Sequence, residues 1–403
     1  MKNILIVTHY FPPEIGAPQA RLSEMAKIFA ETQDVTVLTG MPNHPTGIIA
    51  NGYEKCISKE EFTDNYRILR SWVYATPNEG FIKKTLSHIS FMISSILLNY
   101  RKVKNVDVVI VSSPTFFSIF AAYFIAKTKR AKFVLEIRDL WPGIFIELGV
   151  LTNKYIIALL TNIEMFFYQQ ADLVITVTQG FKDNIVERGI LESKVKVIRN
   201  GADVDKFSPL KRSKSTREKF KAKDNDLVVL YSGAHGISHG LDSVVDAAEL
   251  LKDSDDIKFV FVGEGAKKRE LINQAKYLNN VLFLPSVNRQ QMPDLIANAD
   301  ICLAPLKDVP LFSTFIPSKI FEYMAMSKPV IGCLTGEPAS ILLEAGQIVI
   351  EPENPRVLAE TVKSLSNDKH NLNQIGIAGR NFVTKNFNRS NLNTYYLELI
   401  NQL

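Results

Sequence analysis

The sequence is poor in cysteine and tryptophan and has no long apolar run. Its 403 residues include three cysteines and two tryptophans, and Cys56, Cys302 and Cys333 lie far apart. This usage is typical of a reducing compartment and argues against a disulfide framework or a metal cluster. No apolar run reaches the roughly 20 residues of a membrane span, and the apolar part of the N-terminus is too short for a signal peptide. We therefore expect a globular chain that stays in the cytoplasm.

Internal repeats, low-complexity tracts and a strong charge bias are also missing. The net charge is +5, and a content of 46% hydrophobic and 22% charged residues is ordinary globular composition. Residues 1–200 carry 23 Lys and Arg against 18 Asp and Glu, whereas residues 201–403 carry 24 of each. The first half is therefore the half expected to meet an anionic surface, and we expect this surface to be a membrane rather than a nucleic acid.

Short β-branched runs alternate with helical segments along the whole chain, for example at residues 3–8, 132–137, 227–232 and 257–262. This alternation predicts the α/β class, with two Rossmann-like, doubly wound parallel-sheet domains that face each other across a cleft. The predicted boundaries are 1–200 and 226–385 for the domains, 201–225 for a linker, and 386–403 for a C-terminal helix that crosses back to the first domain. Ligands of such sheets bind outside the carboxyl ends of the strands.

Residues 81–102 form an unusual segment. Apolar residues recur from Ile82 to Tyr100 at spacings of four and three, serines lie on another face, and basic residues flank both ends. One interpretation is a helix in the domain core. The other is a helix that lies in a membrane interface with its basic ends on anionic headgroups, and the charge of this half favours it. The predicted membrane contacts are Lys83, Lys84, Ile89, Ile93, Arg101 and Lys102.

The stretch 316–332, IPSKIFEYMAMSKPVIG, predicts a helix followed by a buried strand. Pro317 is suited to the first helical position, which places Ser318 and Lys319 in the first turn, where free N–H groups attract anions. Glu322 interrupts an otherwise apolar helix. Glu322 is either a helix-surface residue or a carboxylate that binds sugar hydroxyls while the helix start holds phosphates.

A glycine-rich loop, GAHGISHG, runs from Gly233 to Gly240 between a strand and a helix. Its glycines would let the backbone approach a phosphate. His235 and His239 are spaced like a metal pair on a helix, but the glycines argue against a helix, so we expect His239 beside a phosphate. Glu264, in a Gly-Glu-Gly turn after the next strand, is expected to line the same pocket.

Four further carboxylates follow predicted strands or lie between the domains. Glu14 and Gly16 occupy the turn after the first strand, where Gly16 would touch a phosphate or sugar and Glu14 would orient an acceptor hydroxyl; a solvated turn is the alternative. Asp139 follows Arg138 and precedes Trp141-Pro142 and is either an acceptor-side carboxylate or a partner of Arg138. Asp203-Val-Asp205 resembles a metal-binding D-x-D, but it lies in the linker, so no metal is expected there.

Together these segments resemble the glycosyltransferase family 4 retaining enzymes, which have the GT-B fold. The resemblance spans nearly the whole chain and rests on THYFPPEIGAPQARLSEMA, MPNHPTG, RDLWP, NGADVDKFSP, SGAHGISHGLD, VFVGEG and PSKIFEYMAMSKPVIG. Within the family the chain is most similar to bacterial enzymes that add fucosamine or fucose while O-antigen, capsule or colanic-acid repeat units are built on a polyprenyl-diphosphate carrier.

The resemblance implies roles for individual residues. It implies that Glu322 binds the nucleotide ribose, that Ser318, Lys319 and the loop at Gly233 meet the diphosphate, and that Gly16 touches the donor phosphate. A uracil-type base would lie near residues 285–287. Two positions depart from the family pattern: the first Glu of its E-x7-E motif falls at Thr314, and its usual Arg and Lys after the glycine loop fall at Ala234 and His239.

The predicted function is a retaining, metal-independent transfer without a cofactor, with Glu14, Asp139 and Lys319 as catalytic residues. The expected donor is a UDP-sugar, with an N-acetyl-fucosamine-type 6-deoxy sugar. The expected acceptor is a polyprenyl-diphosphate-linked sugar at the inner face of the cytoplasmic membrane. Because of the two departures, a non-catalytic sugar-nucleotide-binding scaffold remains an alternative, as does a GT-B epimerase or hydrolase.

Overall fold

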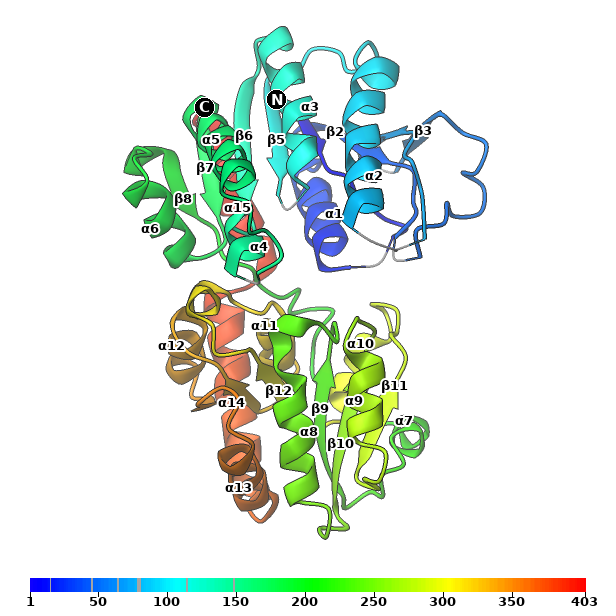
Figure 1. Cartoon of the computed structure of the whole chain (residues 1–403), viewed down its shortest axis with the longest axis vertical. Coiled ribbons are helices and arrows are strands. Elements are labelled where there is room, and N and C mark those ends of the chain that lie inside the picture. Colours follow the sequence, from blue (N-terminus) through cyan, green and yellow to red (C-terminus); the bar gives the residue numbers. More distant parts are fainter. Residues whose placement is uncertain (15, 45, 64, 78–80, 114, 148) are drawn as a thin grey trace. The chain divides into compact units, whose positions relative to one another are not determined.

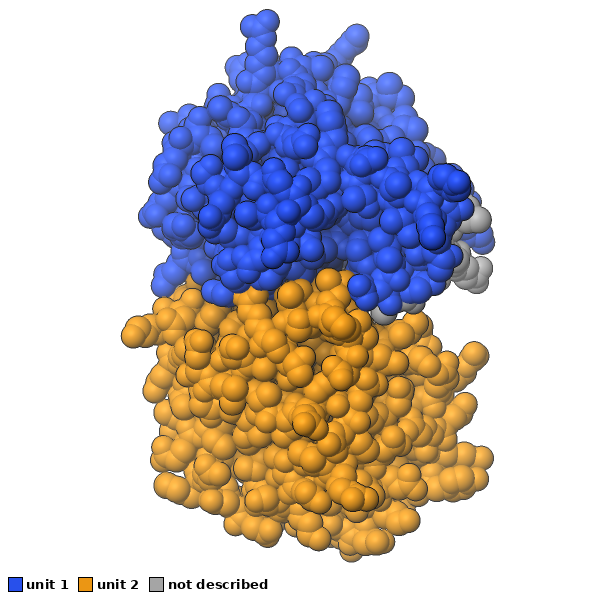
Figure 2. Space-filling view, turned by 60° about the vertical axis from the view of Figure 1, so that its left-hand side comes forward, with its two compact units in different colours: residues 1–199, 390–403 blue, residues 200–389 orange. Residues whose placement is uncertain are grey.

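The computed structural model describes residues 1–403 except 15, 45, 64, 78–80, 114 and 148, and it does not describe the side chains of residues 17, 18, 81 and 82. The chain divides into two compact units (Figures 1 and 2). Unit 1 comprises residues 1–199 and 390–403, and unit 2 comprises residues 200–389. The C-terminal segment therefore belongs with the N-terminal residues.

Unit 1 is built on an eight-stranded sheet with the order β3-β4-β2-β1-β5-β6-β7-β8. Every neighbouring pair is parallel except β3 and β4, which are antiparallel. The strands are β1 (Asn3–Val7), β2 (Asp34–Gly40), β3 (Ser58–Phe62), β4 (Arg67–Ser71), β5 (Val108–Ser112), β6 (Lys132–Ile137), β7 (Leu173–Thr176) and β8 (Val195–Val197).

Helices cover both faces of this sheet (Figure 1). The helices are α1 (Ala17–Phe29), α2 (Phe81–Ser94), α3 (Phe116–Lys129), α4 (Gly143–Glu147), α5 (Lys154–Gln170), α6 (Gln179–Glu187) and α15 (Arg389–Asn401). On one face, α1 and α15 share a core with alternate residues of the strands, and Phe29 packs on Tyr396 with ring centroids 5.7 Å apart. On the other face, Tyr123 of α3 contacts Phe133 of β6 and Phe167 of α5.

Unit 2 has a six-stranded, fully parallel sheet with the order β11-β10-β9-β12-β13-β14. Its strands are β9 (Leu227–Ser232), β10 (Ile257–Val262), β11 (Val281–Leu284), β12 (Ile301–Pro305), β13 (Val330–Cys333) and β14 (Ile348–Ile350). Its helices are α7 (Lys214–Lys219), α8 (Leu241–Leu250), α9 (Lys268–Gln274), α10 (Met292–Ala297), α11 (Lys319–Ala325), α12 (Glu337–Glu344), α13 (Pro355–Ser366) and α14 (Lys369–Asn386).

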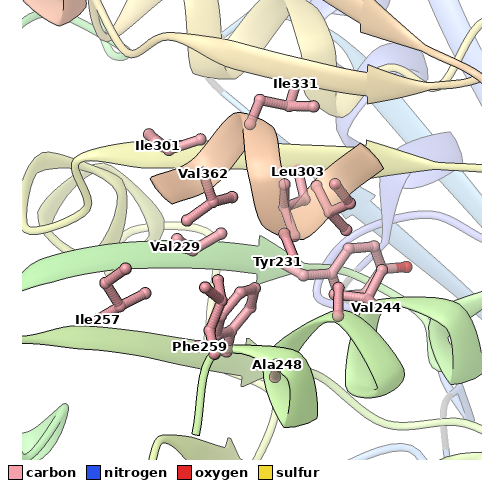
Figure 3. Close-up of a cluster of buried hydrophobic side chains, with 14 of the residues drawn as sticks. Val229, Tyr231, Val244, Ala248, Ile257, Phe259, Ile301, Leu303, Ile331 and Val362 are labelled. Carbon is pink, nitrogen blue, oxygen red and sulfur yellow. The ribbon is translucent and has the colours of Figure 1, made fainter. Parts of the chain in front are cut away.

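The core of unit 2 brings a large ring to the end of its central strand. Side chains of β9, β10 and β12 pack against α8 and α13 (Figure 3). Tyr231, the penultimate residue of β9, lies in this cluster next to Val244, and its hydroxyl points away from the cluster. That hydroxyl donates to the carbonyl of Ala234 at 2.7 Å. The core thus fixes both the ring of Tyr231 and the first residues of the glycine-rich loop.

The segment predicted to be a linker is instead packed on unit 2. Phe207 and Phe220 are fully buried, and α7 forms where no helix was expected. The buried Arg217 of α7 donates from Nη1 to the carbonyl of Asn298 at 3.1 Å and from Nη2 to that of Asp226 at 2.8 Å. The sequence did not predict α7 because the segment has few apolar residues. Hydrogen bonds of Arg217, rather than an apolar stripe, attach this helix to unit 2.

The two places where the chain passes between the units lie side by side. Ala202 and Asn388 form a parallel β-bridge. The amide of Ala202 donates to the carbonyl of Phe387 at 3.0 Å, and the amide of Arg389 donates to the carbonyl of Ala202 at 2.9 Å. The two segments that connect the units are therefore hydrogen-bonded to each other.

Helix α2 differs from the long helix that we predicted for residues 81–102. It ends at Ser94, and a π-helical turn, Ser95–Asn99, follows. Its polar side faces the sheet: Ser94 Oγ donates to the carbonyl of Trp72 at 2.5 Å, and Asn99 Nδ2 donates to Ser71 Oγ at 2.7 Å. Leu86, Ile93 and Leu97 are 48%, 47% and 76% exposed. The apolar stripe that resembled a core face therefore points largely outward, and the side chain of Ile82 lies outside the described residues.

An apolar groove runs along this outward side of α2. It has a volume of about 540 Å³, and its lining includes Ile57, Trp72, Tyr74, Leu86, Ile89 and Ile93. In the part of the chain that the structure describes, no helix combines the length and the apolar character needed to cross a bilayer.

Candidate functional site

The carboxyl ends of β9 and β10 carry two turns that interlock through glycines. Gly233 and Gly263 have φ values of 145° and 149°, which L side chains rarely adopt. A Cβ on Gly263 would lie 1.9 Å from the carbonyl oxygen of Gly233, and a Cβ on Gly265 would lie 2.4 Å from that of His235. Only glycine fits at these points, and the glycine-rich loop is consequently fixed in position at the edge of the sheet.

Lys319 reaches this loop from the start of α11. Its Nζ lies 3.8 Å from the centroid of the Tyr231 ring, and a Cβ on Gly233 would come within 2.6 Å of the same atom. The ammonium is buried and has no hydrogen-bond partner among the described residues. Burial lowers the pKa of Lys319 from its ordinary 10.5 to about 7, although the nearby Glu322 opposes this shift. A buried cation of this kind gains most from an anionic ligand.

The start of α11 differs from the prediction. The helix begins at Lys319 with Ser318 as its N-cap, so Pro317 precedes the helix, and the Ser318 side chain makes no capping hydrogen bond. With seven residues, α11 is also short. The Lys319 ammonium, rather than a long helix dipole, is therefore the main source of positive charge at this edge.

The two histidines of the glycine-rich loop surround the same ring. The rings of His235 and His239 each lie 5.9 Å from that of Tyr231. Burial, together with the charges of Lys268 and Lys319, lowers the pKa of His235 to about 4. Burial together with Lys319 lowers that of His239 to about 3. Both imidazoles are therefore neutral at pH 7.

Glu322 is paired with two arginines that the sequence analysis did not single out. Arg289 Nη1 lies 3.0 Å from Glu322 Oε1, and Arg389 Nη2 lies 3.9 Å from the same oxygen. Arg289 also lies over the ring of Phe207, with its guanidinium carbon 5.3 Å from the centroid. Glu322 is 14% exposed, so it is a partly buried, charge-paired carboxylate rather than a solvated surface residue. These arginines are distant in sequence, and only the fold brings them to Glu322.

Gly240 and Glu264, which were also predicted to contact the donor, lie in the same part of unit 2. Gly240 has φ 55° and is the N-cap of α8. Glu264 is exposed and pairs with Lys268 at 2.8 Å, while Lys268 Nζ also donates to the carbonyls of Gly263 and Leu284. Glu264 therefore supports the two turns through Lys268.

In unit 1, Glu14 is a loop-organising residue. Its Oε2 accepts the amide of Phe11 at 2.9 Å, and its Oε1 accepts the amides of Asn43 and His44, both at 2.8 Å. Burial raises its pKa, and these three amides oppose the shift. Because both oxygens are engaged, the geometry favours a structural role for Glu14 over contact with an acceptor hydroxyl. Gly16 is the N-cap of α1, and its φ of 170° is open to any residue.

Asp139 follows β6 and lines a small interior cavity together with Trp141, Glu164 and Tyr168. Burial raises the pKa of Asp139, and Arg138 opposes this shift. Trp141 stacks on Phe116 with ring centroids 4.1 Å apart. The carboxyl group of Asp139 therefore belongs to a predominantly aromatic pocket within unit 1.

The D-x-D sequence forms a turn, in which Asp203 Oδ1 accepts the amide of Lys206 at 3.0 Å. Across the described residues, no three His, Cys, Asp or Glu side chains are placed to bind a metal ion together.

The residues predicted to contact a membrane differ in their exposure. Lys83, Lys84, Ile93 and Arg101 are exposed. Ile89 is partly buried in the groove, and Lys102 Nζ donates to Ser58 Oγ at 2.8 Å.

Two family models match this chain, one in each half. Residues 31–206 match the model described as Glycosyltransferase Family 4, and residues 212–382 match the model described as Glycosyl transferases group 1. The chain is 25% identical over 389 residues to the putative colanic acid biosynthesis glycosyl transferase WcaI of Escherichia coli K12, covering 92% of this chain and 93% of that protein. It is 25% identical over 203 residues to the putative teichuronic acid biosynthesis glycosyltransferase TuaH of Bacillus subtilis, covering 49% of each.

Solved structures with the same fold align over the full length. Sucrose-phosphate synthase from Thermosynechococcus elongatus aligns with a TM-score of 0.77 at 15% identity, covering 100% of this chain and 99% of that one. HepE of Anabaena, in complex with UDP and glucose, aligns with a TM-score of 0.73 at 18% identity, covering 100% of both chains. At such identities the likeness concerns the fold alone, and it confirms the predicted class of two parallel-sheet α/β domains of the GT-B type.

Proposed function

We propose that this chain is a glycosyltransferase, with a family 4-type half followed by a group 1 half, and that it transfers a sugar with retention from a UDP-sugar to a polyprenyl-diphosphate-linked sugar. The product would be a repeat unit of a bacterial surface polysaccharide, in keeping with the polysaccharide pathways for which WcaI and TuaH are named. We propose an N-acetyl-fucosamine-type 6-deoxy sugar as the group transferred.

The observation that carries the donor part of this proposal is the buried ammonium of Lys319 at the glycine-rich loop. The cation has no hydrogen-bond partner among the residues described, and it lies against a loop whose glycines leave the backbone accessible. A diphosphate bound here would relieve the cost of burying the charge and would raise the pKa of Lys319, keeping it charged. Glu322, on the same helix, would accept hydrogen bonds from the ribose hydroxyls.

The proposed chemistry follows from this charge arrangement. In the transition state negative charge grows on the departing diphosphate, and the Lys319 ammonium and the amides of the loop at Gly233 would stabilise it. The neutral His239, whose ring lies 5.9 Å from that of Tyr231 and is hydrogen-bonded to the backbone of Pro305, would border the same group. We propose attack from the side of the leaving group, with a donor phosphate oxygen as the base and no divalent ion.

A membrane contact of unit 1 is the second part of the proposal. Of the 25 strongly exposed large hydrophobic residues among those described, 18 belong to unit 1 and seven to unit 2. Many of them lie on α2, on the π-helical turn that follows it, and on α3 and α5, which form what we call the outer apolar layer: Leu86, Ile93, Leu97, Phe124, Leu159 and Phe166. Lys83, Lys84 and Arg101 are exposed beside α2. This layer would rest on the anionic cytoplasmic leaflet, where the lipid-linked acceptor resides.

The test is release of UDP from a panel of UDP-sugars in the presence of polyprenyl-diphosphate-linked acceptors, with GDP-sugars as the comparison. Turnover that requires both substrates is expected. We expect Lys319→Ala to lower this turnover by roughly 10²-fold or more, the scale for removing one group that stabilises transition-state charge. Lys385→Ala, a basic residue of α14 that is exposed, is the matched control and should keep full turnover. Acceptor-independent turnover, or normal turnover of the Lys319 variant, would contradict the proposal.

A further inference from the structure

Three of the six histidines of the chain form a cluster in unit 1 that the proposed chemistry does not use. His9 follows β1, His44 lies in the loop after β2, and His88 lies on α2. The ring centroids of His9 and His88 are 4.4 Å apart. Tyr10 lies between the three, with its centroid 4.3 Å from His9, 5.2 Å from His44 and 5.9 Å from His88. The cluster lies at the carboxyl edge of the sheet, where ligands of such sheets bind.

His9 is the unexplained member of this cluster. It is fully buried, yet neither Nδ1 nor Nε2 has a hydrogen-bond partner within the described part of the chain. A buried polar atom that lacks a hydrogen bond is destabilising, so a folded protein rarely leaves both ring nitrogens unpaired without a use for them. Phe91 lies on the other side of His9, with ring centroids 5.1 Å apart, and offers only carbon.

Glu14 explains how the cluster is assembled. Its carboxylate holds the amide of Phe11, next to Tyr10, and the amides of Asn43 and His44 in the second loop. The backbone of His9 joins the same loops, because its carbonyl accepts the amide of Gly40 at 3.2 Å. The loop that carries His9 and the loop that carries His44 are thus fixed against one another by the buried carboxylate of Glu14.

The chemistry of the cluster suits an uncharged, hydroxyl-rich ligand. A neutral imidazole offers one N–H donor and one acceptor nitrogen, and a sugar hydroxyl both donates and accepts. An anion would instead require protonated rings. Burial, with His88 and His44 adding to it, lowers the pKa of His9 well below its ordinary value, and burial with Lys84 lowers that of His88 to about 4. Tyr10 stays protonated, since burial and Glu14 raise its pKa to about 12.

We infer that His9, His44 and His88, with the ring of Tyr10, form the binding site for the acceptor sugar. This inference rests on the proposed function, and it goes beyond it by naming the residues that hold the sugar that receives the new bond. Glu14 is a positioning residue of this site. A metal ion is not the expected ligand, because the described residues include no group of His, Cys, Asp or Glu arranged to bind one.

The experiment uses the six histidines as reporters in the full-length chain. Histidine rings are labelled with ¹³C, and the six ring signals are assigned with single His→Gln variants. The chain is titrated separately with neutral hexoses (glucose, galactose, N-acetylglucosamine and N-acetylgalactosamine), inorganic pyrophosphate and UDP. We expect at least one hexose to move the signals of His9, His44 and His88 in a saturable way. The exposed His370 of α14 is the internal control and should not move.

A variant series gives the titration a structural control. His88→Gln, on a partly exposed ring, should weaken hexose binding about tenfold, the scale of one lost hydrogen bond in a buried site, and leave the melting temperature unchanged. His370→Gln should change neither. Binding of the hexose should also be equal between about pH 6 and 8, because neutral rings bind it.

Three results would overturn the inference. They are no shift of the cluster with any of the four hexoses, a shift with pyrophosphate in place of a hexose, and hexose affinity unchanged in His88→Gln. The proposed function is tested separately by the UDP arm, because UDP should move the signals of His235 and His239 in unit 2. If UDP left those two signals unmoved, the donor site would be wrong even where the hexose result held.

Discussion

At the scale of single residues, this protein keeps several charged or polar side chains buried, and their energetics depend on pH. Lys319 is the main case, because burial lowers its pKa to about 7. Between about pH 7 and its ordinary pKa of 10.5, the unfolded chain binds one proton more than the folded chain at this position. The free energy of unfolding contributed by Lys319 therefore rises with pH across that window.

The first prediction follows from this rise of the unfolding free energy with pH. Lys319→Met should raise the melting temperature of the donor-free protein at pH 6, where the buried charge is fully present, by about 2 °C or more. The gain should shrink as the pH approaches 9. Scanning calorimetry at several pH values measures this, and UDP should stabilise the wild type but not the variant. A melting temperature that falls equally at every pH would show that Lys319 serves only packing.

Arg289 gives a second prediction at this scale. It lies 3.0 Å from Glu322, which we expect to bind the ribose. Arg289→Met should leave Glu322 less well oriented and should reduce the preference for UDP over 2′-deoxy-UDP from about tenfold toward none. Isothermal titration with both nucleotides measures the ratio. A variant that binds both nucleotides more weakly by the same factor would assign Arg289 to the fold rather than to ribose selection.

Gly263 gives the third prediction. A Cβ at this position would lie 1.9 Å from the carbonyl oxygen of Gly233, at a φ of 149°. Gly263→Ala should cost about 2 kcal/mol or more of unfolding free energy and should displace the glycine-rich loop. Urea unfolding followed by UDP binding checks both effects. Gly52→Ala is the comparison in an open position, since nothing lies within 4 Å of a Cβ there.

At the scale of elements, α2 is unusual because its polar side packs inward and its apolar side points outward. Ser94 donates to the backbone of Trp72 just beyond β4, and Asn99 in the following turn donates to that of Arg70 in β4. The groove beside them is lined by exposed apolar side chains. A helix that only covered a sheet would gain stability from the opposite orientation. This arrangement favours a second apolar surface, such as a membrane, as its partner.

The fourth prediction tests that element. Ile93→Asp combined with Leu97→Asp should lower binding to vesicles of anionic lipid by about tenfold or more, because two apolar side chains no longer enter the lipid. Vesicle co-sedimentation at low and high salt measures this binding and separates the apolar part from the basic part. Leu191→Asp, at an equally exposed leucine of unit 1, is the control. Equal binding by all three proteins would remove α2 from the membrane contact.

At the scale of the whole molecule, continuous apolar runs made the strands of unit 2 predictable. The predicted runs 227–232 and 257–262 coincide with β9 and β10, because strands buried on both faces are written as unbroken apolar residues. The pair β3 and β4 was missed, since SKEEF and RILRS are edge sequences whose charges pair across the strands, as Glu61 does with Arg70. Charge pairing between distant residues has no local signature.

The residues of the candidate sites were likewise predictable only where a local sequence pattern indicated them. The glycine-rich loop and Lys319 were accessible to sequence reasoning, because strand-turn-helix patterns place such residues at a sheet edge. The partners of Glu322, the amides bound by Glu14 and the histidine cluster were not accessible. Each of these depends on segments that are mostly tens of residues apart and that meet only when the sheets form. For α2, periodicity gave an apolar stripe but not its direction, which is why a core helix and a membrane-interface helix both stood as interpretations.

The return of the last helix also determines how the chain can be divided in the laboratory. Tyr396 and Ile400 of α15 are fully buried in the core they share with Phe29. A fragment that stops at residue 199 would therefore lack one wall of its own interior and should aggregate. Joining residues 390–403 to that fragment through a short flexible tether should yield a soluble half suited to acceptor studies, whereas residues 200–389 need no such graft.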